Sequence, residues 1–234
     1  MTVSPIAMMF DRIAPTYDAL NHRLSFHWDK VWRRKVAREV ARCCPETILD
    51  LATGTADLAI AMAKRSPQAH ITGADLSEKM LEVGREKVTR EGLENQILLT
   101  VGDAAELSFP DGAFDVVTVA FGVRNFSHLD QALSEIRRIL KPSGSLFILE
   151  FSMPTRFPVK QVYGFYLRKI LPVIGKHYSK DPDAYRYLSD SVQRFPSPLK
   201  FAQQLSAAGF QTACHTPLTF GVVTLYHAKT SSKQ

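Results

Sequence analysis

The stretch ILDLATGTADLAIAMA, residues 48–63, decides the fold class of this chain. An apolar run typical of a buried strand leads through Asp50 into a turn with a single glycine, Gly54, and a helical pattern follows. This junction is similar to a nucleotide-binding loop. It lacks the Lys-Ser/Thr pair of a phosphate-binding P-loop and the three glycines of a dinucleotide loop. We therefore expect a ligand without a pyrophosphate.

Strand and helix patterns alternate from this loop onward. The expected strands are residues 47–51, 69–75, 96–101, 114–121 and 145–151. The expected helices are residues 56–64, 77–91 and 129–140, and a Lys-Pro-Ser-Gly turn follows the last of them. Strands separated by helices of this length predict a parallel sheet that helices cover on both faces.

Both ends of the chain add further elements. Two helices, residues 8–21 and 28–43, are expected before the loop, and helices at 159–171 and 182–195 interrupt the alternation with aromatic, basic sequence. A helix at 197–208 and strands at 210–218 and 221–229, forming an antiparallel ribbon, complete the pattern. We predict an α/β, Rossmann-like fold with a mostly parallel seven-stranded sheet, helices on both faces and an antiparallel edge strand.

Length and composition favour one domain over residues 1–234, because 45% hydrophobic residues suffice for a single core. No stretch approaches the roughly 18 to 20 consecutive apolar residues that span a bilayer. Residues 1–11 lack signal-peptide features, so we expect a cytoplasmic protein. Cys43 and Cys44 are adjacent and Cys214 is distant, without metal-ligand spacing. We expect free thiols and no metal.

The net charge of +6 favours an anionic partner, either nucleic acid or an acidic membrane surface. Basic residues gather in residues 30–35, at Arg38 and Arg42, and in residues 160–180. A solvated helix face explains the same charges equally well. Charge therefore narrows the partners without choosing one.

Three successive strand ends carry the chemistry that an adenosine needs. In the loop of residues 50–57, Gly54 permits close approach of the backbone to a ligand. The carboxylate of Asp75 can accept both hydroxyls of a ribose. Asp103 can accept the exocyclic amino group of adenine beside the Ala104 N–H.

An acid at a single strand end is weaker evidence, because Asp75, two residues before Ser77, can also cap the next helix. The combination of three strand ends favours a ligand. Several acids without a nearby Arg or Lys suit a cationic one. S-adenosylmethionine, a sulfonium without a pyrophosphate, meets both demands.

The chain resembles the quinone C-methyltransferases along almost its whole length. The resemblance is carried by MFDRIAPTYDALNHRLSFHWDKVWRR (9–34), LDLATGTAD (49–57), AELSFPDGAFDVVTVAFGVRN (105–125), LKPSGSLFILEFS (140–152) and DAYRYLSDSV (183–192). FGVRN, YDALN and YRYL are the family-specific segments, whereas the adenosine loops are general to class I methyltransferases. This resemblance implies a class I methyltransferase fold.

The resemblance also implies that Thr55, Asp75, Asp103 and Ala104 bind the methyl donor. Asp50 and Gly54 of the loop are expected to bind it as well. Many relatives have glycine at the positions of Thr53 and Ala56, and alanine is tolerated there if the local φ is negative. Ala120 stands where the family often has serine, so one donor contact is expected to be missing.

By the same resemblance, residues 1–45 form a helical lid and residues 46–151 a donor-binding core. Residues 152–196 form a helical substrate insertion, and residues 197–234 close the sheet. Substrate-side residues are expected in the lid and the insertion. In the lid these are Tyr17 and Asn21, with Asp18 between them, and in the insertion Tyr185, Arg186 and Tyr187. Core packing or helix capping explains several of them equally well.

Arg124 and Asn125 of FGVRN are the expected catalytic residues. A quinol carbon attacks a methyl group only when its ring carries negative charge, so a neighbouring hydroxyl must lose its proton. The guanidinium of Arg124 can orient a water and stabilise the phenolate, and Asn125 can hold the same oxygen. An ion pair of Arg124 with a carboxylate is the alternative. His177 is a less favoured catalytic candidate.

The predicted activity is S-adenosylmethionine-dependent C-methylation of a prenylated quinol, with demethylmenaquinol ahead of a methoxy-polyprenyl-benzoquinol. A nicotinamide oxidoreductase and a basic RNA-directed protein are weaker alternatives, because the loop lacks glycines and no RNA-binding module is evident. The expected partners are a lipid quinol and, transiently, the anionic inner face of a membrane. A homodimer is possible, and no nucleic acid is expected.

Overall fold

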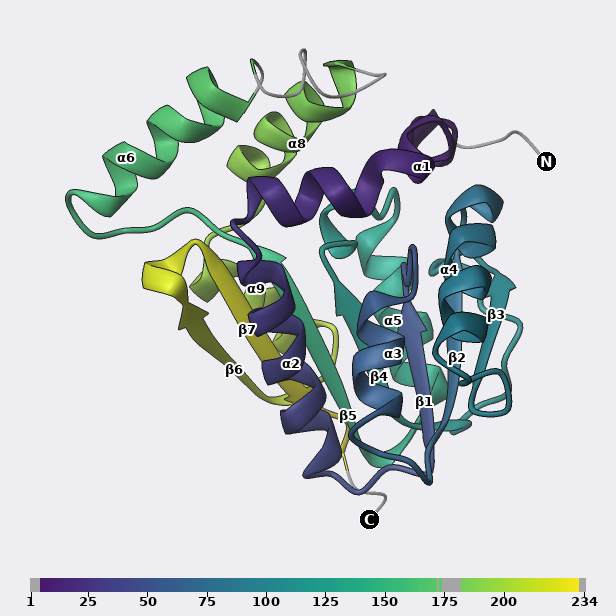
Figure 1. Cartoon of the computed structure of the whole chain (residues 1–234). Coiled ribbons are helices and arrows are strands. Elements are labelled where there is room, and N and C mark those ends of the chain that lie inside the picture. The colour runs from purple at the N-terminus through teal and green to yellow at the C-terminus, as the bar shows by residue number, and fades with distance from the viewer. Residues whose placement is uncertain (1–4, 172, 174–181, 232–234) are drawn as a thin grey trace.

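The computed structural model describes residues 5–171, 173 and 182–231, and its centre is a single sheet (Figure 1). The strands are β1 Thr47–Leu51, β2 His70–Asp75, β3 Ile97–Val101, β4 Phe114–Ala120, β5 Leu140–Phe151, β6 Gln211–Leu218 and β7 Val223–Lys229. In this part of the chain they form one seven-stranded sheet in the order β3-β2-β1-β4-β5-β7-β6. Strands β1 to β5 are parallel, and β7 pairs antiparallel with both β5 and β6. The predicted sheet is confirmed.

Helices cover both faces of this sheet. They are α1 Pro5–Leu24, α2 Trp28–Ala41, α3 Asp57–Ala63, α4 Glu78–Arg90, α5 Leu129–Ile139, α6 Val159–Phe165, α8 Pro182–Arg194 and α9 Pro198–Ala207. Three short helices are η1 Val123–Asn125, η2 Tyr166–Ile170 and η3 Thr219–Gly221. One core cluster joins α2, α3 and α4 to the sheet, and a second joins α5 and α9 to its other face.

The central strand β1 shows why the sheet is buried on both faces. Ile48 belongs to the first core cluster and Leu49 to the second, and both side chains are fully buried. Because successive side chains of a strand point to opposite faces, a continuous apolar run is the pattern of a doubly covered strand.

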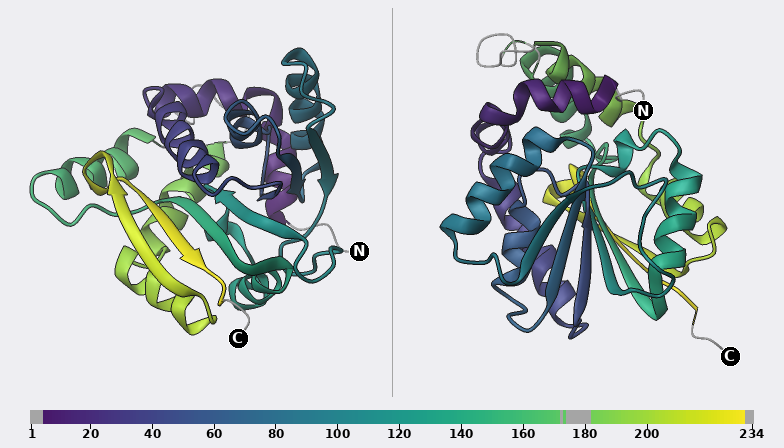
Figure 2. Two further views of the ribbon diagram at one scale, coloured as in Figure 1. Left: turned by 90° about the horizontal axis from the view of Figure 1, so that it is seen from below. Right: turned by 90° about the vertical axis from the view of Figure 1, so that its right-hand side faces the viewer.

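A third cluster lies outside these two layers. It joins α1, η2 and α8 through residues such as Ile13, Leu167 and Val192. Figure 2 shows α1 and α8 above the carboxyl ends of the parallel strands, on the opposite side from the C-terminus. Ligands of parallel sheets collect at this edge, so this helical layer covers the expected site.

Three expectations about local structure need correction. The Lys-Pro-Ser-Gly segment is part of β5 and not a turn after α5: Leu140 pairs with Phe114, Ser145 pairs with Val116, and the irregularity between them absorbs the extra residues. The expected helix at 159–171 is divided into α6 and the π-helical η2. The first helix is longer than predicted at both ends, because α1 runs over Pro5–Leu24 and not over 8–21.

The described cysteines are free, as expected, and all three are exposed. Among the described residues, no helix has both the length and the apolar character that crossing a membrane requires.

Candidate functional site

The loop after β1 approaches β2 through its backbone. Gly54 has a φ of 56°, and its N–H donates to Asp75 Oδ2 at 2.8 Å. The condition for tolerating alanine is not met at Ala56, whose φ is 63°. A left-handed alanine costs about 1 kcal/mol, so this loop holds strain that glycine would avoid.

The carboxylate of Asp50 supports the loop after β1 through hydrogen bonds. Its two carboxylate oxygens accept hydrogen bonds from Thr53 Oγ1 at 2.7 Å and Thr118 Oγ1 at 2.5 Å. Burial raises the pKa of Asp50 to about 6, and the two hydroxyl donors oppose that shift. The side chain lines neither cavity described below. Asp50 was predicted among the donor-binding residues, but its position makes it a support for the loop.

Asp75 ends β2 with both oxygens engaged by backbone amides. Oδ2 accepts from Gly54, and Oδ1 accepts from the Ser77 N–H at 2.9 Å. Burial raises the pKa of Asp75, and these N–H donors lower it. Ser77 is the N-cap of α4, because its Oγ accepts from the Met80 N–H at 3.2 Å. The carboxylate of Asp75 therefore bridges the loop and the helix start.

A smaller cavity of about 80 Å³ lies at these strand ends. It is lined by Ile6, Ala7, Phe10, Tyr17, Leu51, Ala52, Gly54, Asp75, Leu76, Met80, Gly102, Ala104, Ala120, Phe121, Gly122, Asn125 and Phe126. Among these described residues, Asp75 is the only one with a formal charge. The smaller cavity thus brings together the predicted Gly54, Asp75 and Ala104.

Two other predicted donor residues lie outside the smaller cavity. Asp103 is exposed, and its Oδ1 accepts from the Ala105 N–H at 2.9 Å, which closes a local turn. Thr55 is buried, and its Oγ1 donates to Asp18 Oδ1 at 2.6 Å. Neither residue is among those that line this space.

The contact between Thr55 and Asp18 is part of a charged network that ties α1 to the core. Lys87 Nζ on α4 donates to Asp18 Oδ2 at 2.8 Å, to Thr55 Oγ1 at 3.1 Å and to Asp57 Oδ1. A second tie joins Asp11 of α1 to the hydroxyl of Ser77 at 2.5 Å. The helix over the strand ends is therefore fastened by polar contacts.

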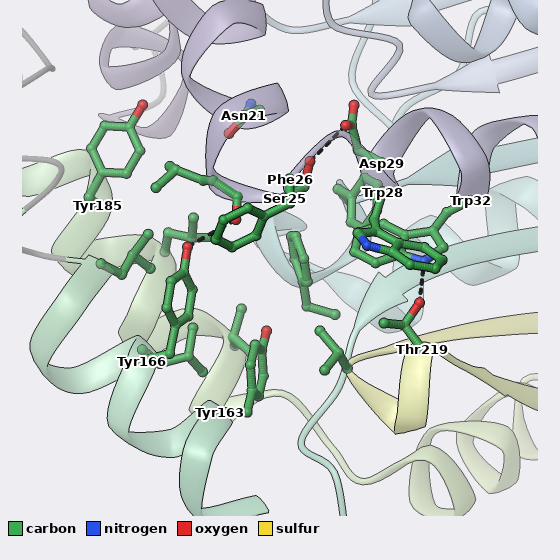
Figure 3. A pocket seen from close by; sticks show the side chains of 18 of the residues that line it. Asn21, Ser25, Phe26, Trp28, Asp29, Trp32, Tyr163, Tyr166, Tyr185 and Thr219 are labelled. Atoms are coloured by element: carbon green, nitrogen blue, oxygen red, sulfur yellow. Dashed lines mark hydrogen bonds between the residues drawn. The ribbon is translucent and has the colours of Figure 1, made fainter. Parts of the chain in front are cut away.

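A larger cavity of about 490 Å³ lies beside the smaller one (Figure 3). It is lined by Met9, Phe10, Ile13, Tyr17, Asn21, Leu24, Ser25, Phe26, Trp28, Asp29, Trp32, Arg33, Phe121, Arg124, Phe151, Pro158, Val159, Val162, Tyr163, Tyr166, Leu167, Leu171, Ala184, Tyr185, Tyr187, Leu188, Val192, Thr219 and Val222. Its walls are mostly apolar and aromatic. Figure 3 shows Tyr163, Tyr166 and Tyr185 on one side, with Trp28 and Trp32 on the other.

Three aromatic residues line both cavities. They are Phe10 and Tyr17 of α1 and Phe121 at the end of β4. Burial raises the pKa of Tyr17, while Arg124 and Arg33 lower it. Its phenol thus stays protonated as a hydrogen-bond donor at the boundary between the two spaces.

Arg124 lies in the wall of the larger cavity with a buried carboxylate as its partner. Its Nη1 donates to Glu150 Oε1 at 2.8 Å and to the Phe121 carbonyl. The side chains are 6% and 0% exposed. Burial raises the pKa of Glu150, and Arg124 lowers it. The ion pair that was the alternative role of Arg124 is therefore present.

This ion pair does not use the whole guanidinium. The Nε of Arg124 is buried and has no hydrogen-bond partner within the described ranges. The guanidinium also lies 5.6 Å from the ring centre of Phe151, so it packs on an aromatic face. Glu150 fixes the orientation of this cation in the wall of the larger cavity.

The remaining predicted residues divide between the two spaces. Asn125 lines the smaller cavity, and its Oδ1 accepts from Tyr187 Oη at 2.9 Å. Asn21, Tyr185 and Tyr187 line the larger cavity. Asn125 is thus linked to α8 and not directly to Arg124.

Arg186 was expected beside Tyr185 but lies on the outer surface and is not among the described lining residues. Adjacent helical residues differ by about 100° in direction, so burial of Tyr185 turns Arg186 away. His177 lies outside the described residues.

Several site residues were missed from the sequence. Glu150 and Lys87 are the principal ones, with Asp29 and Arg33 in the wall of the larger cavity. For Glu150 there was a signal, because a single acid ends the apolar run SLFILEF. Lys87 gave no such signal, because a lysine on an amphipathic helix is ordinarily solvated.

One cluster, His22, Asp29 and Asp57, has the composition of a metal site. It already contains cations, because Arg33 Nη1 donates to Asp29 Oδ2 at 2.6 Å and Lys87 contacts Asp57. Ser25 and His22 also hydrogen-bond to Asp29 at 2.7 Å each. Side-chain cations and hydroxyls therefore account for these carboxylates.

The chain is similar in sequence to known methyltransferases. The model of the ubiE/COQ5 methyltransferase family matches residues 2–230. A demethylmenaquinone methyltransferase of Bacteroides fragilis is 45% identical over 223 residues, which cover 95% of this chain and 91% of that protein. One from Thermus thermophilus is 45% identical over 218 residues, covering 93% and 98%. A ubiquinone/menaquinone biosynthesis C-methyltransferase of Geotalea daltonii is 44% identical, covering 94% of each chain.

Solved structures share the fold at low identity. A SAM-dependent methyltransferase from Aquifex aeolicus has a TM-score of 0.58 at 18% identity, covering 79% of this chain and 81% of that one. A putative methyltransferase from Bacillus halodurans has a TM-score of 0.60 at 20% identity, covering 85% and 99%. The expected methyltransferase fold is confirmed.

Proposed function

The chain belongs to the ubiE/COQ5 methyltransferase family, and from this premise we propose that it transfers a methyl group from S-adenosylmethionine to a ring carbon of demethylmenaquinol. The observation that carries the proposal is the meeting of two unlike cavities at Phe10, Tyr17 and Phe121. A methyl transfer needs its two reactants in contact, at about 3 to 3.5 Å between the reacting atoms. A shared wall is the place where such contact occurs.

The smaller cavity fits the methyl donor in its chemistry. The carboxylate of Asp75 faces this space without a lining Lys or Arg among the described residues, which suits a cationic ligand with ribose hydroxyls. A Cβ added to Gly54 would meet nothing within 4 Å, so the loop backbone borders open space. S-adenosylmethionine, when bound, supplies an electrophilic methyl group.

The smaller cavity is too small for that donor as it stands. Its 80 Å³ compares with about 300 Å³ or more for typical ligand pockets. Because Ile6, Ala7 and Phe10 of α1 form part of its wall, we infer that α1 moves outward when the donor enters. The ties from Asp11 and Asp18 would then hold the helix when it closes.

The larger cavity fits a quinol with an isoprenoid tail. Its volume of about 490 Å³ and its aromatic, aliphatic walls suit a flat ring and a hydrocarbon chain. The polar groups are few and lie at defined places, including Arg124 and Tyr17. A quinol hydroxyl placed beside Arg124 would lie against a guanidinium already oriented by Glu150.

Arg124 would contribute by stabilising charge. A guanidinium stays protonated and is a poor base, but it lowers the energy of a phenolate formed on the ring beside it. Phenolate charge makes the neighbouring ring carbon nucleophilic, and its attack on the methyl group would break the methyl–sulfur bond and release S-adenosylhomocysteine. The attacked carbon would then lose its hydrogen as a proton, so that the aromatic quinol is restored and one proton in all leaves to solvent. The phenol of Tyr17, whose pKa is raised by burial, would donate a hydrogen bond at the same boundary and exclude water from it.

The test is a methyl-transfer assay with the purified protein under reducing conditions. Short-chain demethylmenaquinol and a short-chain methoxybenzoquinol are offered separately with S-adenosylmethionine, and mass spectrometry locates the added methyl group. We expect ring methylation of the naphthoquinol. Methylation of the benzoquinol alone would favour the ubiquinone-pathway alternative, and methylation of neither would contradict the proposal.

A lipid substrate also implies contact with a membrane. We infer that the protein works in the cytoplasm and visits an anionic membrane surface without spanning it. The net charge of +6 favours this attraction. Vesicle binding that rises with anionic lipid and falls with salt would support it.

A further inference from the structure

Three exposed phenylalanines belong to segments that line the larger cavity. Phe26 is 77% exposed, Phe157 is 82% exposed and Phe220 is 83% exposed. Phe26 lines the cavity itself, and the other two are next in sequence to the lining residues Pro158 and Thr219. We call Phe26, Phe157 and Phe220 the phenylalanine rim.

Hydrogen bonds and packing hold the three rim segments together, although they are far apart in sequence. Trp32 Nε1 donates to Thr219 Oγ1 at 2.8 Å, which ties α2 to η3. Tyr166 Oη donates to the Leu24 carbonyl at 3.0 Å, which ties η2 to the end of α1. Ser152 Oγ donates to the Gly221 carbonyl at 2.9 Å, which ties η3 to the segment before α6. Figure 1 shows α6 and the tip of the β6–β7 hairpin on the same side of the molecule.

The backbone is strained where it presents two of these rings. Phe26 has a φ of 50° and Phe220 a φ of 57°. Bulky residues rarely adopt this left-handed conformation, because their Cβ crowds the following carbonyl group. Glycine would relieve the strain, and an exposed ring returns no burial energy to the fold. Strain of this kind indicates that the exposed rings contact something other than the protein's own fold.

The surroundings of the rim are apolar and basic. Val162 and Phe165 on α6 are 66% and 57% exposed. Residues 152–170 contain four cations, Arg156, Lys160, Arg168 and Lys169. Neither residues 152–170 nor residues 211–229 contain an Asp or Glu. Around Phe157, exposed apolar side chains flanked by cations without acids match the apolar interior and anionic headgroups of a lipid leaflet.

We propose that the phenylalanine rim inserts into an anionic lipid bilayer and opens the larger cavity toward the acyl chains. The proposal rests on the proposed function, because the isoprenoid tail of a quinol substrate is what would enter the larger cavity from the bilayer. Binding of the phenylalanine rim to the bilayer itself needs no turnover. It places the mouth of the cavity at the depth where an isoprenoid tail lies. A substrate would then pass from the leaflet into the cavity without crossing water.

Vesicle binding of the full chain tests the proposal. Flotation is measured with phosphatidylglycerol and with phosphatidylcholine vesicles, and Trp28, 49% exposed in the cavity wall, reports insertion by quenching with brominated lipid. We expect binding to phosphatidylglycerol and quenching of Trp28. The variant Trp28→Phe leaves only Trp32 as an emitter and should lose most of the quenching.

Matched variants separate insertion from general stickiness. Phe157→Ser with Phe220→Ser should weaken vesicle affinity by about tenfold or more, because each buried ring contributes to partitioning. Leu98→Ser with Leu199→Ser is the control, since these residues are 67% and 61% exposed on β3 and α9, away from the rim. The control should bind vesicles like the parent protein.

A glycine variant tests the meaning of the strain. Phe220→Gly removes an exposed ring from a position with positive φ. It should keep or raise the melting temperature while it weakens vesicle binding. A lower melting temperature with unchanged vesicle binding would show that the ring serves the fold, and would overturn the proposal.

Other results would also overturn it. Failure of the parent protein to bind either vesicle does so, as does equal binding by the Phe157→Ser, Phe220→Ser variant. Self-association that this variant abolishes, without vesicle binding, would show an interface between copies. Failure of the proposed function is distinguishable: the protein would bind vesicles through the rim yet methylate no quinol in detergent.

Discussion

The two cavities are built in opposite ways. The smaller one is defined by strand ends and by backbone amides, as in the contact of Gly54 with Asp75. The larger one is enclosed by side chains from segments between Met9 and Val222, mostly aromatic and aliphatic. The first depends on a few directional hydrogen bonds, and the second on packing between elements far apart in sequence. Substitution of a single polar residue should therefore impair the smaller cavity more selectively than the larger one.

One site in the larger cavity breaks this rule. The ion pair of Arg124 and Glu150 is as buried and directional as any contact around the smaller cavity. If it serves the reaction, its loss should affect turnover and not donor affinity. The comparison thus predicts separate kinetic signatures for the two walls.

Changing Arg124 should have the largest effect. Arg124→Ala removes a preorganised cation beside the proposed phenolate, and such losses lower turnover by about 10² to 10³. Arg124→Lys should recover little, because an ammonium lacks the planar fork. Turnover with a short-chain quinol is compared with donor affinity from calorimetry, and the latter should stay near that of the parent.

This variant needs a folding control, because Arg124→Ala leaves Glu150 buried without its cation. Such an uncompensated charge destabilises a protein by about 3 to 5 kcal/mol. Adding Glu150→Gln should restore stability, as measured by urea unfolding, without restoring turnover. Normal turnover in a folded variant would make Arg124 structural.

The next largest effect concerns Asp50, behind the loop of the smaller cavity. Burial raises its pKa from 3.8 to about 6. The folded state therefore holds the proton more tightly than the unfolded state. Protonated Asp50 therefore stabilises the folded state below about pH 4. This stabilisation is lost as the pH rises through 6, a change of about 3 kcal/mol in the free energy of unfolding.

Asp50→Asn removes this titration. Asp50→Asn should gain stability relative to the parent protein as the pH rises. The difference in unfolding free energy, variant minus parent, should increase by up to about 3 kcal/mol between pH 4 and 7. Urea unfolding across this window measures the difference. Gln203→Ala, at an exposed position on α9 without an ionisable group, is the control and should show no such change. A difference for Asp50→Asn that is independent of pH would contradict the assignment.

Asp75 should give a smaller effect on donor binding, with some loss of stability because its carboxylate also accepts from the Gly54 and Ser77 amides. Asp75→Ala removes the only charged group lining the smaller cavity among the described residues. Losing hydrogen bonds to a charged acceptor costs about 1.5 to 3 kcal/mol, which is roughly tenfold to a hundredfold in donor affinity. Calorimetry with S-adenosylmethionine measures it, and circular dichroism checks the fold. Unchanged affinity would remove Asp75 from the donor site.

The sequence predicts the sheet because its signals are local. Each strand and helix of the core carries its own periodicity, and Gly54, Asp75 and Ala104 meet because parallel strands end at one edge. The Lys-Pro-Ser-Gly segment shows the limit. Its composition is that of a turn, but pairing with β4 keeps it in β5.

The larger cavity was less predictable because contacts between distant elements decide it. Tyr185 and Arg186 are neighbours in sequence, yet packing of α8 buries one and exposes the other. The pairing of Arg124 with Glu150 crosses from η1 to β5, and no local pattern specifies it. Likewise, Lys87 joins the site only because α1 lies over α4.

The smallest expected effect tests whether Thr55 fastens α1 or contacts the donor. Thr55→Val keeps the shape of the side chain and removes the hydroxyl that donates to Asp18 and accepts from Lys87. The loss should be about 1 kcal/mol, or roughly fivefold in the equilibrium between closed and open α1. Hydrogen exchange in the protein without donor should then be faster in residues 5–24. Thr216→Val, at an exposed position on β6, is the control. If exchange is unchanged but donor affinity falls, Thr55 contacts the donor directly, and the smaller cavity owes less to its lid than its geometry indicates.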